Sequence, residues 1–123
     1  TTAELVSYLK QHPKVETMLF PFDENFPQYQ LAKEQMKNVC GLFTFVLKSN
    51  KREDIVKFCE SLQHIMMAVS WGGHESLVIP KCAGLQPGEF DPGNKEHRYI
   101  RMYAGLEDAG YLVNDLKQAL EKI

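Results

Sequence analysis

The sequence predicts a mixed α/β domain, a sandwich in which a mostly antiparallel sheet of three to five strands carries its helices on one face. Four segments have apolar residues at helical spacing, and short apolar or alternating runs typical of strands lie between them. The chain has 123 residues, of which 44% are hydrophobic, and this is enough to form one core. Residues 1–123 are therefore expected to form a single domain with helices packed against one side of the sheet.

The first part of the chain is expected to form a helix, a strand and a second helix. Thr1 and Glu4 predict a capping box for the first helix, which ends before Pro13. Residues 15–20 indicate a short strand. Pro27 suits the first turn of the second helix. The apolar stripe of that helix would consist of Tyr29, Ala32, Met36 and Val39.

The middle of the chain predicts two strands with a helix between them. Residues 42–47 form the clearest strand, and because both of its faces are apolar we expect it to be central. Asn50 is the expected cap of a helix whose inward residues include Cys59. Residues 65–69 indicate a buried strand, with Met66 and Met67 in the core.

The last part predicts two strands separated by a long surface loop at 81–97, followed by a helix. Residues 77–79 form the first of these strands, and Pro80 closes it. Residues 99–105 alternate, so that Ile100, Met102 and Ala104 share one face while Tyr99, Arg101 and Tyr103 share the other. Asp108 is expected to cap the last helix.

Charge and cysteine content exclude several classes of function. The net charge of −2 offers no basic face for nucleic acid and no polybasic membrane patch, and no apolar run approaches the ~20 residues of a membrane span. The three cysteines have no metal-site spacing and favour a reducing, cytoplasmic location. We expect Cys40 and Cys59 to be buried, whereas Cys82, in the long loop, could act as a nucleophile only beside a base that the sequence does not show. Because the chain starts at Thr1 with no signal peptide or initiator methionine, a preceding segment is expected.

The candidate site begins at Ser70-Trp71-Gly72-Gly73, which follows an apolar run. A hydroxyl, an indole and two glycines at the end of a strand indicate one wall of a small-molecule pocket, and Arg101 is the candidate cation. Three simpler interpretations stay open: an ion-paired surface arginine, a tryptophan in the core or an interface, and a serine that only ends the strand. His74 and Glu75 lack a third metal ligand, and neighbouring side chains are expected to point apart. Glu75 is expected to form a structural ion pair or hydrogen bond.

Several segments, in this order, resemble the C-terminal domain of the Cys/Met-metabolism enzymes, which depend on pyridoxal phosphate (PLP) and catalyse transsulfuration. They are His-Pro-Lys-Val at 12–15, Leu-Ala-Lys at 31–33, Gly-Leu-Phe-Thr-Phe at 41–45, Ser-Trp-Gly-Gly-His-Glu-Ser-Leu at 70–77 and Arg-Met-Tyr-Ala-Gly-Leu-Glu-Asp at 101–108. Trp71 makes the chain most similar to bacterial cystathionine β-lyases. His74, in place of tyrosine, and Tyr103, in place of a small or polar residue, depart from the pattern.

The resemblance implies roles for three residues. Arg101 would bind the α-carboxylate of a sulfur-containing amino-acid substrate, Ser70 would lie beside that carboxylate, and Trp71 would line the substrate. A guanidinium suits a carboxylate because it donates two parallel hydrogen bonds. The lysine that forms a Schiff base with the cofactor belongs to the family's large domain, which residues 1–123 lack. We therefore expect no catalytic residue, no covalently bound PLP and no activity in residues 1–123 alone.

The same resemblance implies a full-length carbon–sulfur lyase that assembles as a homotetramer and binds neither nucleic acid nor membrane. One alternative is a γ-elimination or γ-replacement enzyme: cystathionine γ-lyase, cystathionine γ-synthase or methionine γ-lyase. An alternative of another class is a free-standing module that binds amino acids or a protein without catalysis.

Overall fold

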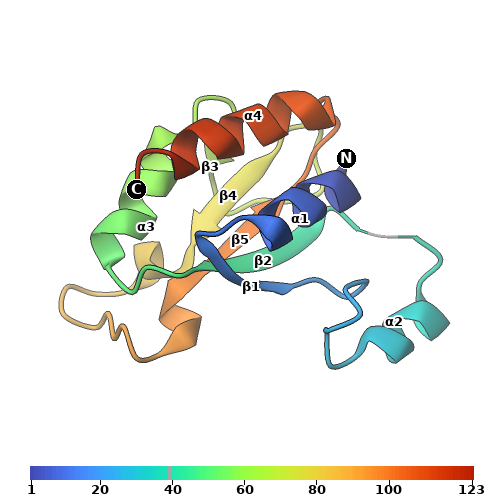
Figure 1. The fold of residues 1–123 in the computed structure, drawn as a ribbon, viewed down its shortest axis with the longest axis horizontal. Helices are drawn as coiled ribbons and strands as arrows, with labels where there is room; N and C mark the ends of the chain where they lie inside the picture. Colours follow the sequence, from blue (N-terminus) through green and yellow to red (C-terminus); the bar gives the residue numbers. More distant parts are fainter. Residues whose placement is uncertain (39) are drawn as a thin grey trace.

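A computed structural model describes residues 1–38 and 40–123, which form a five-stranded sheet with a layer of helices on one face (Figure 1). The covering helices are α1 (Thr2–Gln11), α3 (Arg52–Ser61) and α4 (Ala109–Leu120). A shorter helix, α2 (Tyr29–Gln35), lies apart from this layer (Figure 1). The predicted fold class and the one-sided placement of the main helices are confirmed.

The sheet has the strand order β1-β2-β5-β4-β3. Its strands are β1 (Val15–Leu19), β2 (Leu42–Leu47), β3 (Met66–Met67), β4 (Leu77–Pro80) and β5 (Tyr99–Tyr103). All neighbouring strands are antiparallel except β3 and β4, which are parallel. The predicted surface loop between β4 and β5 contains two short 3₁₀ helices, η1 (Lys81–Gly84) and η2 (Lys95–Arg98). In this strand order β5 is the central strand, and β2 lies beside it.

The register of β5 separates the two faces of the sheet. Ile100 pairs with Phe45, and Met102 pairs with residues of both neighbouring strands; these side chains are fully buried beneath the helices. Arg101 pairs instead with Thr44 and Ile79, so these three residues lie on the face that carries no helix. The alternation predicted for residues 99–105 is confirmed over 99–103, where the strand ends.

The helix caps were predicted only in part. Asp108 accepts the backbone N–H of the third residue after it and caps α4, as expected. Thr1 precedes α1 but forms no side-chain cap bond, so the predicted capping box does not form. α3 begins after Lys51 rather than Asn50. The Oγ of Ser49 accepts the backbone N–H of Lys51 at 3.2 Å, which holds the approach to α3 in a turn.

The predicted buried strand at 65–69 is wrong for most of its length. Only Met66 and Met67 pair with β4, and because they lie at the edge of the sheet they are 54% and 51% exposed. Ile65 is buried as expected. The chain is anchored at this point by Asp115 on α4, whose carboxylate accepts three consecutive backbone N–H groups, the last that of Ile65, each at 2.9 Å. The neighbouring His64 is exposed.

Helix α2 is shorter than its apolar stripe predicted. It begins after Gln28, so Pro27 lies outside its first turn, and its one buried residue is Ala32. Met36 has extended backbone angles and ends the helix. Val39 lies outside the described residues.

The cysteines differ in burial. Cys59 is buried as predicted, and burial, with a further contribution from Cys82 and Glu60, raises its pKa to about 12. Cys82 is also buried, and burial raises its pKa, so it is not poised as a nucleophile. Cys40 is exposed, contrary to expectation, because it lies before β2 begins and outside the core.

Candidate substrate-binding site

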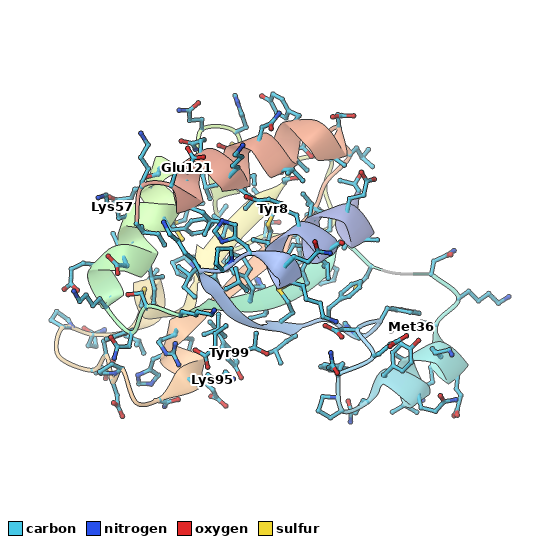
Figure 2. The ribbon with its side chains drawn as sticks, in the orientation of Figure 1. Tyr8, Met36, Lys57, Lys95, Tyr99 and Glu121 are labelled. Atoms are coloured by element: carbon cyan, nitrogen blue, oxygen red, sulfur yellow. The ribbon has the colours of Figure 1, made fainter. Side chains whose placement is uncertain are left out.

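A hollow of about 540 Å³ opens on the helix-free face of the sheet. It lies over β2, β5 and β4, next to η1, and most of its wall is apolar. Figure 2 shows Tyr99, one of its lining residues, on the opposite side of the sheet from Tyr8 of α1. The lining includes Thr44, Val69, Ile79, Lys81, Tyr99 and Arg101.

Arg101 is placed in this hollow by its position on the central strand. Its neighbours in the sheet are Thr44 on β2 and Ile79 on β4, and both line the hollow with it. Its Nη2 donates a hydrogen bond to the backbone carbonyl of Val69 at 3.1 Å. In the described part of the chain, no acidic side chain forms an ion pair with Arg101. Because a guanidinium has five N–H donors, Arg101 can still form a bidentate pair with a carboxylate.

Ser70 and Trp71 follow Val69 on the loop between β3 and β4. Both are exposed, and neither lines the hollow directly; Trp71 is 61% exposed and is therefore no core residue. Gly72 has a φ of +88°, a left-handed conformation that favours glycine at this turn. The structure brings Arg101 against the start of this loop, one residue from Ser70.

A partly buried cluster of hydrogen bonds joins the end of the same loop to the segment after β5. The Glu107 carboxylate accepts the N–H of Ser76 and the Oγ–H of Ser76, both at 2.7 Å, and Ser76 Oγ accepts the N–H of Gly105 at 2.9 Å. Burial raises the pKa of Glu107, but the hydrogen bonds from Ser76 outweigh it and hold the pKa below its usual value. A Cβ on Gly105 would lie 2.2 Å from the backbone oxygen of His74, so only glycine allows this approach.

Two further contacts shape the loop. The hydroxyl of Tyr103 donates to the carbonyl oxygen of Gly73 at 3.0 Å. His74 Nδ1 lies 3.2 Å from the carboxylate of Glu75, so these neighbours contact each other instead of pointing apart, and Glu75 makes the polar contact expected of it.

The described residues lack two features that would indicate other functions. Nowhere in 1–38 and 40–123 do three or more His, Cys, Asp or Glu side chains gather in a way that could hold a metal ion. Over the same ranges, every helix is too short or too polar to cross a bilayer.

Most of the wall of the hollow was not predicted from the sequence. The alternation of β5 placed Tyr99 on the face of Arg101, but Thr44 and Ile79 join them only through the pairing register, which the sequence does not show. Lys81 comes from η1, within a segment expected to be irregular loop.

The fold and the hollow define a small α/β domain with a cationic site on the open face of its sheet. The sequence of residues 1–121 matches the family described as Cys/Met metabolism PLP-dependent enzyme, and the chain belongs to this family.

Relatives in this family include both γ- and β-lyases. The chain is 34% identical to the L-methionine gamma-lyase of Treponema denticola over 98% of its own length and 31% of the relative. It is 34% identical to the cystathionine gamma-lyase of Bacillus subtilis, over 98% of the chain and 32% of the relative. The cystathionine beta-lyase of Escherichia coli is 30% identical over 100% of the chain and 32% of the relative. The chain thus spans about a third of the length of the curated relatives it matches.

The enzymes of this family depend on PLP. The lining of the hollow supplies two cationic side chains, Lys81 and Arg101, but among the described residues it contains no carboxylate that could pair with the nitrogen of the pyridine ring. The hollow therefore does not fit the cofactor by itself, whereas a guanidinium on an apolar floor fits the carboxylate end of an amino acid.

Proposed function

We propose that residues 1–123 form the C-terminal, substrate-binding domain of a larger PLP-dependent lyase of sulfur-containing amino acids, and that Arg101 binds the α-carboxylate of the substrate. The observation that supports this role is that Arg101 lies in an apolar hollow without an acidic partner among the described residues. A charged hydrogen bond is stronger in such surroundings than in water. The contribution of Arg101 is to fix the orientation of the substrate.

Ser70 and Trp71 complete the proposed substrate site. Arg101 donates a hydrogen bond to the carbonyl of Val69, and Ser70 is the next residue in the chain. Its hydroxyl would donate to the same carboxylate, and the exposed indole of Trp71 would cover the apolar part of the substrate. Both contacts form only when substrate occupies the hollow.

The experiment that tests the proposal is steady-state kinetics of Arg101→Ala in the full-length protein. We expect a steep rise in KM and a fall in kcat/KM of about 10²- to 10³-fold, because the variant leaves a desolvated carboxylate without its charged partner. Arg52→Ala, which removes an exposed arginine of α3, is the matched control and should behave as the parent does. An unchanged kcat/KM for Arg101→Ala would refute the assignment.

The proposed subtype is a cystathionine β-lyase, on the basis of Trp71 in the loop. A γ-lyase is the second candidate, since relatives with both names match the chain. Product analysis of the full-length protein acting on cystathionine separates them: β-elimination releases homocysteine, whereas γ-elimination releases cysteine.

We also propose that the lysine that binds the cofactor lies in another part of a longer, cytoplasmic and homotetrameric protein. Reduction with borohydride after incubation with PLP, followed by mass spectrometry, should label a lysine outside residues 1–123. A specifically labelled lysine within residues 1–123 would contradict this division.

A candidate of another class is a free-standing module that binds amino acids without catalysis. Its binding site would be the apolar hollow that Arg101 lines. Calorimetry of residues 1–123 with cystathionine or methionine tests it, because tight binding without cofactor would favour the module over the lyase domain.

A further inference from the structure

We infer that Tyr103 is a positioning residue for substrate binding, whose hydroxyl keeps Ser70 and Trp71 at the mouth of the Arg101 hollow. This inference rests on the proposed function of Arg101. It assigns a role to a side chain that lies beside the hollow but is not part of its lining.

Arg101 and Tyr103 hold the loop from two points of the same strand. Both side chains lie on the helix-free face of β5, since residues two apart in a strand point the same way. Arg101 donates to the carbonyl of Val69 at 3.1 Å, and Tyr103 donates to the carbonyl of Gly73 at 3.0 Å. The three residues between these carbonyls, 70–72, are exposed. The two side chains of β5 therefore fix both ends of the segment that carries Ser70 and Trp71.

The ring of Tyr103 is itself held in place by backbone. A Cβ built on Gly41 would lie 2.6 Å from the Tyr103 ring, so glycine lets the ring lie directly against the chain just before β2. The carbonyl of Gly41 accepts the N–H of Ala104 at 2.9 Å, which keeps this part of the chain beside the end of β5. Packing against the backbone of the sheet therefore restricts the Tyr103 ring and fixes the position of its hydroxyl.

The two hydrogen bonds that tether the loop, from Arg101 to Val69 and from Tyr103 to Gly73, differ in how they respond to substrate. The substrate carboxylate would bind the guanidinium of Arg101. The carbonyl of Val69 and the carboxylate would therefore compete for the N–H donors of the same guanidinium. The hydroxyl of Tyr103 does not face this competition. When Arg101 turns toward a carboxylate, Tyr103 is the tether that keeps the loop over the hollow. Its loss should therefore weaken substrate binding more than it alters the chemical step.

Tyr103→Phe in the full-length protein tests this role, because it removes the hydroxyl and keeps the ring. We expect KM for the sulfur amino acid to rise roughly two- to tenfold, the range that one neutral hydrogen bond accounts for, with kcat nearly unchanged. Tyr111→Phe, the same change on an exposed tyrosine of α4, is the matched control and should leave KM unaltered.

A double-mutant cycle separates positioning from general support of the fold. If Tyr103 acts through the loop, Tyr103→Phe should have a much smaller effect on KM in a background that carries both Ser70→Ala and Trp71→Ala than in the parent. An effect of equal size in both backgrounds would overturn the inference, because a merely structural role does not depend on Ser70 or Trp71.

A spectroscopic readout tests the inference without turnover. Trp71 is the single tryptophan among these 123 residues, and in full-length protein labelled with 5-fluorotryptophan its ¹⁹F resonance is assigned by its loss in Trp71→Phe. We expect Tyr103→Phe to shift and narrow this resonance in the substrate-free protein, whereas Tyr111→Phe leaves it unchanged. A resonance and a KM identical to those of the parent would contradict the inference.

The kinetics of Arg101→Ala, measured in the same assay, distinguish a wrong role for Tyr103 from a wrong role for Arg101. If Arg101→Ala raises KM and Tyr103→Phe does not, the positioning role of Tyr103 is wrong and the proposed carboxylate site stands. If Arg101→Ala also keeps the parental KM, the proposed function is wrong, and the role assigned to Tyr103 falls with it.

Discussion

Glu107→Gln is expected to lower the free energy of unfolding by about 1.5–3 kcal/mol at neutral pH. The carboxylate accepts two hydrogen bonds from Ser76, both at 2.7 Å, and Ser76 is fully buried. Glutamine keeps one acceptor oxygen for the N–H of Ser76, but its amide NH2 is a donor and cannot accept the Oγ–H of Ser76 as the carboxylate does. One charged hydrogen bond is therefore lost and the other becomes neutral, while the packing changes little.

The pKa of Glu107 makes this prediction dependent on pH. Because the folded pKa is below the usual value of 4.5, the carboxylate stabilises the fold fully above that pH, and the contribution is lost as the pH falls through the folded pKa. Urea unfolding followed by circular dichroism should thus show a large difference between parent and variant at about pH 7 and a small one at about pH 3. Glu60→Gln, an exposed carboxylate on α3, is the control. A difference below about 0.5 kcal/mol at neutral pH, or one that does not shrink with acid, would contradict a stabilising role for the Glu107 carboxylate.

Two further predictions concern buried groups elsewhere in the domain. Asp115→Asn should cost about 2–4 kcal/mol, measured by thermal or urea unfolding, because the carboxylate accepts three backbone N–H groups at 2.9 Å; a loss within 0.5 kcal/mol would contradict this role. In the native state, a thiol reagent at mildly alkaline pH should modify Cys40 rapidly and leave Cys59 and Cys82 unmodified, whereas all three react after denaturation. Rapid native modification of either buried thiol, counted by mass spectrometry, would contradict their burial.

Local patterns in the sequence predicted the parts of the fold that depend on local physics. The alternation of residues 99–103 gave the correct inner and outer faces because a strand repeats every two residues whatever its neighbours are. Asp108 was predicted as a cap because its bond partner lies three residues away. The failure at Met66 and Met67 has the opposite cause, since exposure of an apolar strand depends on whether it lies at the edge of the sheet.

The candidate site was predicted in the same partial way. Arg101 donates to the carbonyl of Val69, but Ser70 and Trp71 do not line the hollow, so their place in one pocket with Arg101 stays a prediction. The sequence did not predict Glu107 as a structural anchor. Its actual partner, Ser76, lies 31 residues earlier and is joined to it only by the fold.

The proposed role of Arg101 is best tested by the discrimination of the full-length enzyme between a sulfur amino-acid substrate and its α-carboxamide analogue. The parent should prefer the carboxylate by about 10²- to 10³-fold in kcat/KM, since only the carboxylate can form two charged hydrogen bonds with Arg101. In Arg101→Ala this preference should fall close to one, because both substrates then lose the guanidinium. A preference that survives intact in Arg101→Ala would show that another group binds the carboxylate, and would contradict the account.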